Sequence, residues 1–128
     1  MRILLDTMAF LWWVTDDRSL PDRIRKVVGD PENLIFFSAA SAWEIVIKAK
    51  LGKLKLKQPA ARFIRRHLQK NDISGLAIEV SHALHVYKLP DIHRDPFDRI
   101  LIAQAQLERM NLATNDEDIQ KYDVSILW

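Results

Sequence analysis

Four acidic residues stand where the chain turns from one structural element to the next. They are Asp6 after RILL, Glu44 in SAASAWE, Asp98 in DPFDR and Asp116 in LATND. Because they are far apart in the sequence, only the fold can gather them, and gathered carboxylates repel one another unless a cation lies between them. Carboxylate oxygens are the ligands that hard divalent ions prefer. The pattern therefore predicts a Mg²⁺ or Mn²⁺ site.

Three of these acids also have an ordinary structural explanation. Asp6 could cap the helix that follows it, because Asp is a favoured N-cap residue. Glu44 could pair with Lys48 four residues later, and Asp98 could stabilise the N-terminus of its own helix. Taken singly, each explanation competes with metal binding, whereas the full set of four favours the metal.

The fourth acid has a close competitor in the sequence. Asp116 competes with Asp118 in TNDEDI, which could be the acidic first turn of a helix. Asp116 is preferred because it is nearer the end of a strand, beside the oxygen-bearing side chains of Thr114 and Asn115. Asp95 is a second-choice ligand, because it could instead be the N-cap of the helix that contains Asp98.

Short apolar runs and helical segments alternate around these acids. The apolar runs, which predict strands, are residues 2–6, 34–38, 76–80, 112–114 and 124–128. Alternation of this kind predicts an α/β fold with a mostly parallel sheet and helices on both faces. Ligands of such sheets bind beyond the carboxyl ends of the strands, where Asp6 and Asp116 fall.

Helix boundaries follow from cap residues and apolar spacing. Pro21 and Gly29 bracket one helix, and Ser81 is the predicted N-cap of the segment HALHVYKL. Asp95 and Pro96 predict an N-cap and a first helical position for FDRILIAQAQLERM. The other predicted helices are residues 8–14, 39–53, 60–71 and a short one between the last two strands.

Length and composition limit the kinds of protein this chain can be. It has 128 residues, 48% of them hydrophobic, which suits one domain with a single core. There is no cysteine, so a disulfide framework and a thiolate zinc site are excluded, and a reducing cytoplasm is expected. The early apolar stretches are too short for a membrane span or a signal segment, so we expect a cytoplasmic protein with no membrane partner.

The basic residues suggest a partner that carries phosphates. The formal net charge is only +2, but residues 48–57 hold five lysines. Such a run is usually a solvated face, yet it could guide an RNA backbone towards the acids, as could Arg62, Arg65 and Arg66. The pair His82 and His85 has no third zinc ligand, so packing or surface roles are favoured.

Several motifs together resemble those of PIN-domain ribonucleases. They are ILLDT, SAASAWEI, LGKL, DPFDRILIAQA, LATND and the closing LW, and the match runs through nearly the whole chain, as a single PIN domain over residues 1–128. Within that superfamily the chain is most similar to the VapC-type toxins of bacterial toxin–antitoxin systems. The resemblance implies a PIN-like fold with a five-stranded sheet in the order 3-2-1-4-5.

The resemblance also implies an activity and a ligand set. The family's metal-binding acids correspond to Asp6, Glu44, Asp98 and Asp116, with one or two Mg²⁺ (or Mn²⁺) ions and hydrolysis of RNA to 5′-phosphate and 3′-hydroxyl ends. Asp6 and Asp98 are expected to hold the ion that activates water, and the other two acids to complete its shell. The implied partners are the RNA substrate, a cognate antitoxin and a second copy of the chain in a homodimer.

Other functions remain open at this point. A receiver domain or a haloacid-dehalogenase phosphatase is disfavoured, because the latter needs a second Asp where this chain has Met8. A housekeeping RNA-processing nuclease of the same fold, and a non-catalytic module that binds RNA or protein, are the remaining alternatives. One of Trp12 and Trp13 is expected in the core and the other at a protein interface.

Overall fold

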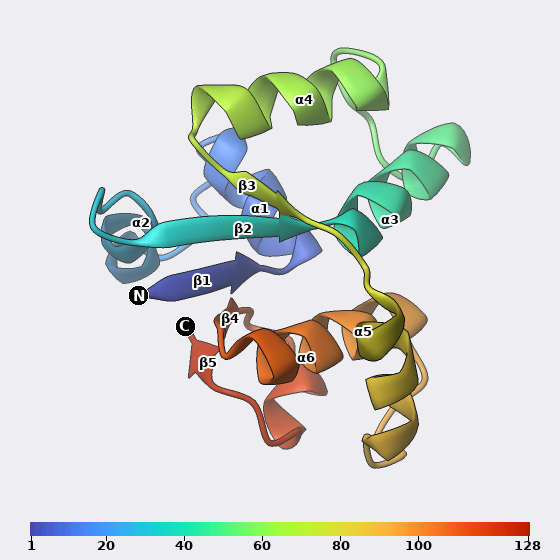
Figure 1. Ribbon diagram of the computed structural model, residues 1–128. Helices are drawn as coiled ribbons and strands as arrows, with labels where there is room; N and C mark the ends of the chain where they lie inside the picture. Colours follow the sequence, from blue (N-terminus) through green and yellow to red (C-terminus); the bar gives the residue numbers. More distant parts are fainter.

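Five parallel strands form the centre of the molecule. The computed structural model describes residues 1–128, and its sheet has the order β3-β2-β1-β4-β5 with helices on both faces (Figure 1). Every neighbouring pair of strands is parallel. The strands are β1 (Arg2–Leu5), β2 (Leu34–Ser38), β3 (Ser74–Leu76), β4 (Asn111–Ala113) and β5 (Ile126–Leu127). The predicted fold class and strand order are confirmed.

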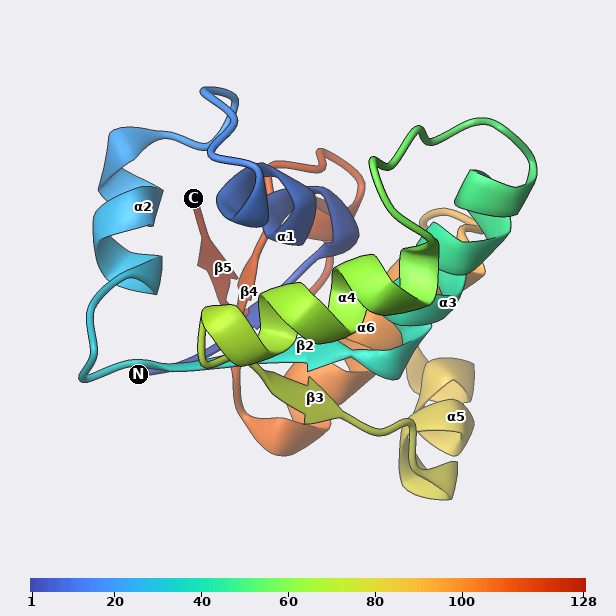
Figure 2. The same cartoon turned by 90° about the horizontal axis from the view of Figure 1, so that it is seen from above.

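Helices connect the strands and cover the sheet, as the view from above shows (Figure 2). The predicted order of strand, two helices and strand in the first third is confirmed. The α-helices are α1 (Thr7–Val14), α2 (Asp22–Val28), α3 (Ala39–Lys50), α4 (Ala60–Lys70), α5 (Val80–His85) and α6 (Pro96–Glu108). Two 3₁₀ helices are η1 (Val86–Lys88) and η2 (Ile119–Lys121). No helix is long and apolar enough to cross a membrane.

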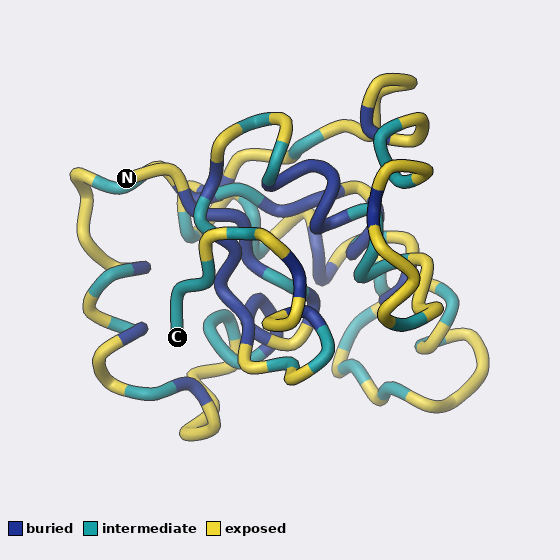
Figure 3. The backbone as a smooth tube through the Cα atoms, turned by 90° about the horizontal axis from the view of Figure 1, so that it is seen from below, coloured by how far each residue is buried: buried dark blue, intermediate teal, exposed yellow.

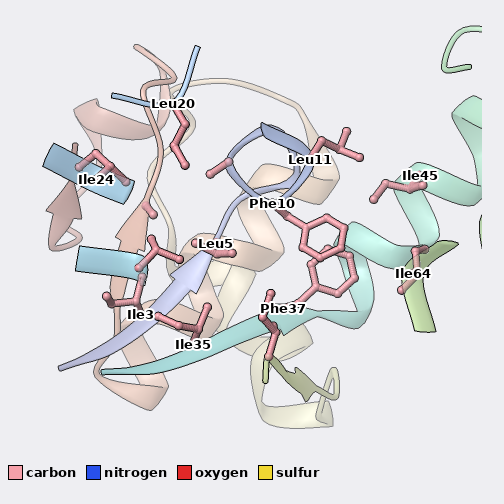
Figure 4. Packing of buried hydrophobic residues seen from close by; sticks show 14 of the residues in the cluster. Ile3, Leu5, Phe10, Leu11, Leu20, Ile24, Ile35, Phe37, Ile45 and Ile64 are labelled. Atoms are coloured by element: carbon pink, nitrogen blue, oxygen red, sulfur yellow. The ribbon is translucent and has the colours of Figure 1, made fainter. Parts of the chain in front are cut away.

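The central strand β1 is apolar on both faces because the core continues on both sides of the sheet. Ile3 and Leu5 join a cluster with α1, α2, α3 and α4, whereas Leu4 joins a second cluster with α6. Successive side chains of a strand point to opposite faces, so this division follows directly from the run ILL. In the first cluster the rings of Phe10 and Phe37 lie 4.1 Å apart between their centres (Figure 4).

Burial follows the same plan. The buried stretches of the chain run through the middle of the molecule, and exposed residues follow the outer helices and loops (Figure 3). On the second face of the sheet, Leu101 and Ile102 of α6 pack with Leu112 of β4 and with Ile119 of η2. These apolar contacts hold α6, which carries Asp98, against the segment after β4, which carries Asp116.

Two predictions for the middle of the chain were wrong. The predicted strand 76–80 overlaps β3 only at Leu76, and the chain leaves the sheet after it. The predicted N-cap Ser81 lies inside α5, which is capped instead by Glu79. The side chains of Glu79 and His82 each bond the other's backbone N–H, and this reciprocal capping box begins the helix two residues early.

The other helix boundaries agree with the sequence to within a few residues. Asp95 caps α6 and Pro96 is its first residue, as predicted. Pro21 is the N-cap of α2 rather than its first helical residue, and Gly29 follows its end. The helix predicted for 39–53 ends at Lys50, and Gly52 beyond it takes a positive φ of 76°, which glycine adopts without steric cost.

Candidate metal centre

Asp6 lies at the carboxyl edge of the sheet, between β1 and β4. Its backbone N–H donates to the carbonyl of Ala113 at 3.0 Å, which continues the pairing of the two strands. Its side chain is the N-cap of α1 and accepts a hydrogen bond from the Ala9 N–H at 2.7 Å. The capping role predicted as the ordinary explanation is therefore real, and it fixes one carboxylate oxygen at the edge where ligands of parallel sheets bind.

Glu44 is buried on α3, with only 8% of its surface exposed. The hydroxyl of Thr7 donates to Glu44 Oε1 at 2.6 Å, and the ammonium of Lys48 lies 2.5 Å from Oε2. A buried carboxylate is costly unless it is hydrogen-bonded and paired, and here it has both kinds of partner. The ion pair with Lys48 expected from the spacing of four is present.

Asp98 is the third residue of α6. Its backbone N–H is held by the Asp95 side chain at 3.0 Å, so Asp95 does the capping and the Asp98 carboxylate is left to point elsewhere. Asp98 Oδ2 lies 3.0 Å from His93 Nε2. The sequence singled out Asp98 but gave no indication of this histidine.

Asp116 begins the segment that follows β4. Its Oδ1 accepts hydrogen bonds from the backbone N–H groups of Asp118 at 2.8 Å and Ile119 at 3.0 Å, and its own N–H donates to the hydroxyl of buried Thr114. Asp118 points outward and pairs with Lys121. The choice of Asp116 over Asp118 as a metal ligand stays a prediction.

Electrostatics link the four acids. Burial raises the pKa of Asp6 to about 6, and the charges of Asp116 and Glu44 push it in the same direction while hydrogen bonds from Thr114 and Ala9 oppose it. Burial likewise raises the pKa of Asp98 to about 6, with further upward effects from Asp95 and Asp116. Asp116 therefore acts on both Asp6 and Asp98, as expected when carboxylates share one neighbourhood.

Lys48 supplies the nearest positive charge to this group. Its pKa is raised, first by the hydrogen bond to Glu44 and also by the charges of Asp95 and Asp98. As the side chains stand, no three His, Asp or Glu groups converge closely enough to hold an ion. An oxygen-only donor set with pKa values raised by burial and mutual repulsion nevertheless suits a hard divalent cation, whose charge would favour the ionised carboxylates.

Among the basic residues highlighted by the sequence, Lys48 contacts one of the four acids, Glu44. The remaining lysines of the run are exposed at the end of α3 and in the loop that follows. The arginines at positions 62, 65 and 66 are exposed on α4. Their exposure is compatible with either of the roles considered for them, a solvated face or a guide for a phosphate backbone.

The aromatic residues differ from expectation. Trp12 and Trp13 are both partly buried against the core, so neither is free at the surface in the way predicted for one of them. Trp43 is the most exposed tryptophan, at 61%, and its ring meets that of Phe97 edge to face. Sequence reasoning missed this because helical spacing alone could not tell which face of α3 would be covered.

The two histidines at zinc-like spacing have packing roles. His82 is fully buried, its Nδ1 accepts from the Glu79 N–H, and its Nε2 lies 2.9 Å from Glu108. His85 contacts Gln106. The residue that the sequence gave no reason to select is His93, which lies in a loop with no periodic pattern and reaches Asp98 only through the tertiary fold.

Comparison with known proteins gives a consistent result. A family model described as "PIN domain" matches residues 3–125. "Ribonuclease VapC16" of Mycobacterium tuberculosis is 39% identical to this chain over 61 residues, a match that covers 48% of the chain and 43% of that relative. The aligned part is therefore less than half the length of the curated relative.

Solved structures share the fold over nearly their whole length. VapBC2 from Rickettsia felis, described as bound to a DNA fragment from its promoter, has a TM-score of 0.72 at 16% identity, covering 100% of this chain and 98% of that one. DNA-bound VapBC from Salmonella typhimurium has a TM-score of 0.68 at 14% identity, with coverage of 100% and 97%. VapBC-1 from nontypeable Haemophilus influenzae gives 0.67 at 19%, with coverage of 99% and 97%.

Proposed function

Because the chain belongs to the PIN domain family, we propose that it is a metal-dependent endoribonuclease and the toxin of a toxin–antitoxin pair. The proposal treats residues 1–128 as a single PIN domain acting in the cytoplasm, with no membrane partner. Sequence similarity to Ribonuclease VapC16 and the fold shared with chains from VapBC complexes support it. The observation that carries it is the electrostatic coupling of acids from separate segments, since the charges of Asp116 and Glu44 act on buried Asp6 and the charge of Asp116 also acts on Asp98.

In this proposal Asp6, Glu44, Asp98 and Asp116 hold one or two Mg²⁺ or Mn²⁺ ions. When bound, such an ion lowers the pKa of a water molecule for in-line attack on phosphorus and stabilises the leaving oxygen. Asp6 and Asp98 are assigned to the ion that serves the attacking water, and Glu44 and Asp116 complete the shell directly or through water. Thr7 and Thr114 hold Glu44 and the Asp116 segment in place.

The chain's own residues would also bind and orient the RNA. The exposed lysines lie at the end of α3, the helix that carries Glu44, and in the loop that follows it. From there they can contact the backbone phosphates of an RNA that is bound at the carboxylates. Contacts of this kind recognise the backbone rather than the bases. They add affinity that falls with salt.

Three partners belong to the proposal. The RNA is the substrate, a cognate antitoxin is the inhibitor, and a second copy of the chain completes a homodimer. The VapBC complexes among the structural neighbours support the antitoxin as a partner.

The test is cleavage of end-labelled structured RNA by the purified chain in Mg²⁺ or Mn²⁺. We expect cutting that leaves 5′-phosphate and 3′-hydroxyl ends, that stops with EDTA and that is absent in Asp6→Asn. Asp123→Asn is the matched control, because Asp123 is exposed and its carboxylate contacts no site residue. Cleavage that persists in EDTA and in Asp6→Asn would refute the metal mechanism.

A further inference from the structure

The imidazole of His93 lies between Asp98 and Tyr122. Its Nε2 is 3.0 Å from Asp98 Oδ2, and its Nδ1 is 2.8 Å from the Tyr122 hydroxyl. The side chains of His93 and Tyr122 are largely buried, and their rings meet edge to face with 5.4 Å between their centres. Nothing in the ordinary capping of α6 requires this contact, because Asp95 already bonds the Asp98 N–H.

The direction of each hydrogen bond in this group follows from its neighbours. An ionised carboxylate can only accept, so His93 Nε2 donates to Asp98. The Nδ1 atom of a neutral imidazole is then an acceptor, and the Tyr122 hydroxyl must donate to it. The hydroxyl oxygen is free to accept, and it receives Arg99 Nη1 at 2.9 Å and the His93 backbone N–H at 3.3 Å.

Arg99 fixes the far end of this chain of hydrogen bonds. Besides Tyr122, its guanidinium donates to the carbonyl oxygens of Pro90 at 2.9 Å and His93 at 3.3 Å. It therefore holds the loop before α6 as well as the tyrosine. A histidine anchored at its backbone and at Nδ1 has little freedom to turn, so the position of its Nε2 proton is determined by the fold.

These hydrogen bonds also link Asp98 to the segment that carries Asp116. Asp116 holds the N–H groups that begin η2, and Tyr122 immediately follows the end of η2. His93 thus connects the end of the Asp116 segment to the carboxylate of Asp98. Oδ2 of Asp98 accepts a hydrogen bond from the imidazole, and Oδ1 receives no hydrogen bond from the protein.

We infer that Arg99, Tyr122 and His93 form a hydrogen-bonded chain that positions the Asp98 carboxylate for a divalent ion, with His93 and Tyr122 as positioning residues. The inference rests on the metal site of the proposed function. Removing a partner that orients a metal-binding side chain typically weakens metal affinity by roughly 10- to 100-fold.

The first test measures Mn²⁺ binding by calorimetry for the unsubstituted protein and three variants. We expect His93→Leu to weaken binding roughly 10- to 100-fold. Tyr122→Phe, which keeps the ring and removes the hydroxyl, should weaken it less, and His93→Gln should recover part of the affinity because its amide N–H can replace the Nε2 donor. His85→Leu is the matched control, since His85 contacts Gln106 instead of a site carboxylate.

The second test needs no metal, and its main measurement is made on the unsubstituted protein. At a pH where the imidazole is neutral, nitrogen NMR of the metal-free protein should find the His93 proton on Nε2 rather than on Nδ1, and Tyr122→Phe should shift the Nδ1 signal. A proton on Nδ1, or unchanged Mn²⁺ affinity in a folded His93→Leu, would overturn the inference while leaving the metal site intact. No Mn²⁺ binding by the unsubstituted protein would overturn both.

Discussion

Thr7 Oγ1 lies 2.6 Å from Glu44 Oε1, and this buried contact joins the first turn of α1 to the middle of α3. Thr7 directly follows Asp6 in the chain. The hydroxyl therefore ties the buried Glu44 to the segment that carries the first carboxylate. Residues far apart in the sequence are held beside one another by a hydrogen bond that neither cap nor core packing would require.

Thr7→Val tests this contact, because it keeps the shape of the side chain and removes the donor. The buried carboxylate of Glu44 then loses one of its two partners, which should lower the free energy of unfolding by about 1 to 3 kcal/mol. Urea denaturation monitored by tryptophan fluorescence measures the change. Ser125→Ala, at an exposed position whose hydroxyl makes no hydrogen bond, is the control, and equal stability of both variants would contradict the assigned contact.

Asp6→Asn is expected to stabilise the metal-free protein at neutral pH. Burial raises the pKa of Asp6 from near 3.8 to about 6, so ionisation of this residue opposes folding. Its stabilising contribution is complete below about 3.8 and is lost as pH rises through about 6. Asparagine keeps the acceptor for the Ala9 N–H and carries no charge, so the gain should be on the order of 2 kcal/mol above pH 7.

Chemical denaturation in EDTA, at an acidic and at a neutral pH, measures this gain. The difference between Asp6→Asn and the unsubstituted protein should shrink towards zero at about pH 4, below which Asp6 is neutral in both states. A variant that is less stable at both pH values would show that the carboxylate is held by favourable contacts that outweigh its burial.

Mn²⁺ should raise the thermal midpoint of unfolding of the intact protein. An ion that binds only the folded state stabilises it by mass action, by about 2.7 kcal/mol when the free ion is about 100 times its dissociation constant. For a domain of this size we expect a rise of roughly 5 to 10 °C, reversed by EDTA. Asp98→Asn should lose most of the rise and Asp123→Asn should keep it, and equal shifts in both would place the bound ion elsewhere.

Lys48 should compete with a cation bound by the acids, because its ammonium pairs with Glu44 and interacts with the charges of Asp95 and Asp98. Lys48→Met should therefore increase Mn²⁺ affinity, by roughly threefold to fivefold for an interaction on the order of 1 kcal/mol at a partly exposed site. Calorimetric titration measures it. Lys50→Met on the same helix, which has no ion pair, should leave the affinity unchanged, and weaker binding in Lys48→Met would reverse the assignment.

The exposed lysines after α3 should contribute to RNA binding through phosphates. Replacing Lys53, Lys55 and Lys57 with Gln in an Asp6→Asn background, which prevents cleavage, should weaken binding. The slope of log affinity against log salt should fall by about 0.7 for each phosphate contact removed. Replacing Arg18, Arg23 and Lys26, exposed around α2 at the other end of the molecule, is the matched control, and an unchanged slope in the lysine variant would refute the contact.

The sequence by itself determined the order of elements and most of their boundaries. Its short apolar runs and caps such as Asp95 act locally, and ILL must be buried on both faces, so a parallel sheet between two layers of helices follows. It also identified the four carboxylates, whose joint role as metal ligands stays a prediction. The predicted strand 76–80 was wrong because residues 77–80 lie exposed outside the sheet despite their apolar character, and the mutual capping of Glu79 and His82 cannot be read from hydrophobicity.

Only the tertiary structure decided which partners each carboxylate has. The contacts from Thr7 to Glu44 and from His93 to Asp98 depend on where helices and loops pack, and no local pattern encodes them. The raised pKa values of Asp6 and Asp98 have the same origin, since burial and the charges of distant residues arise only when the sheet edge is assembled. Local sequence specifies elements through short-range sterics and hydrogen bonds, whereas the electrostatics of the site come from long-range packing.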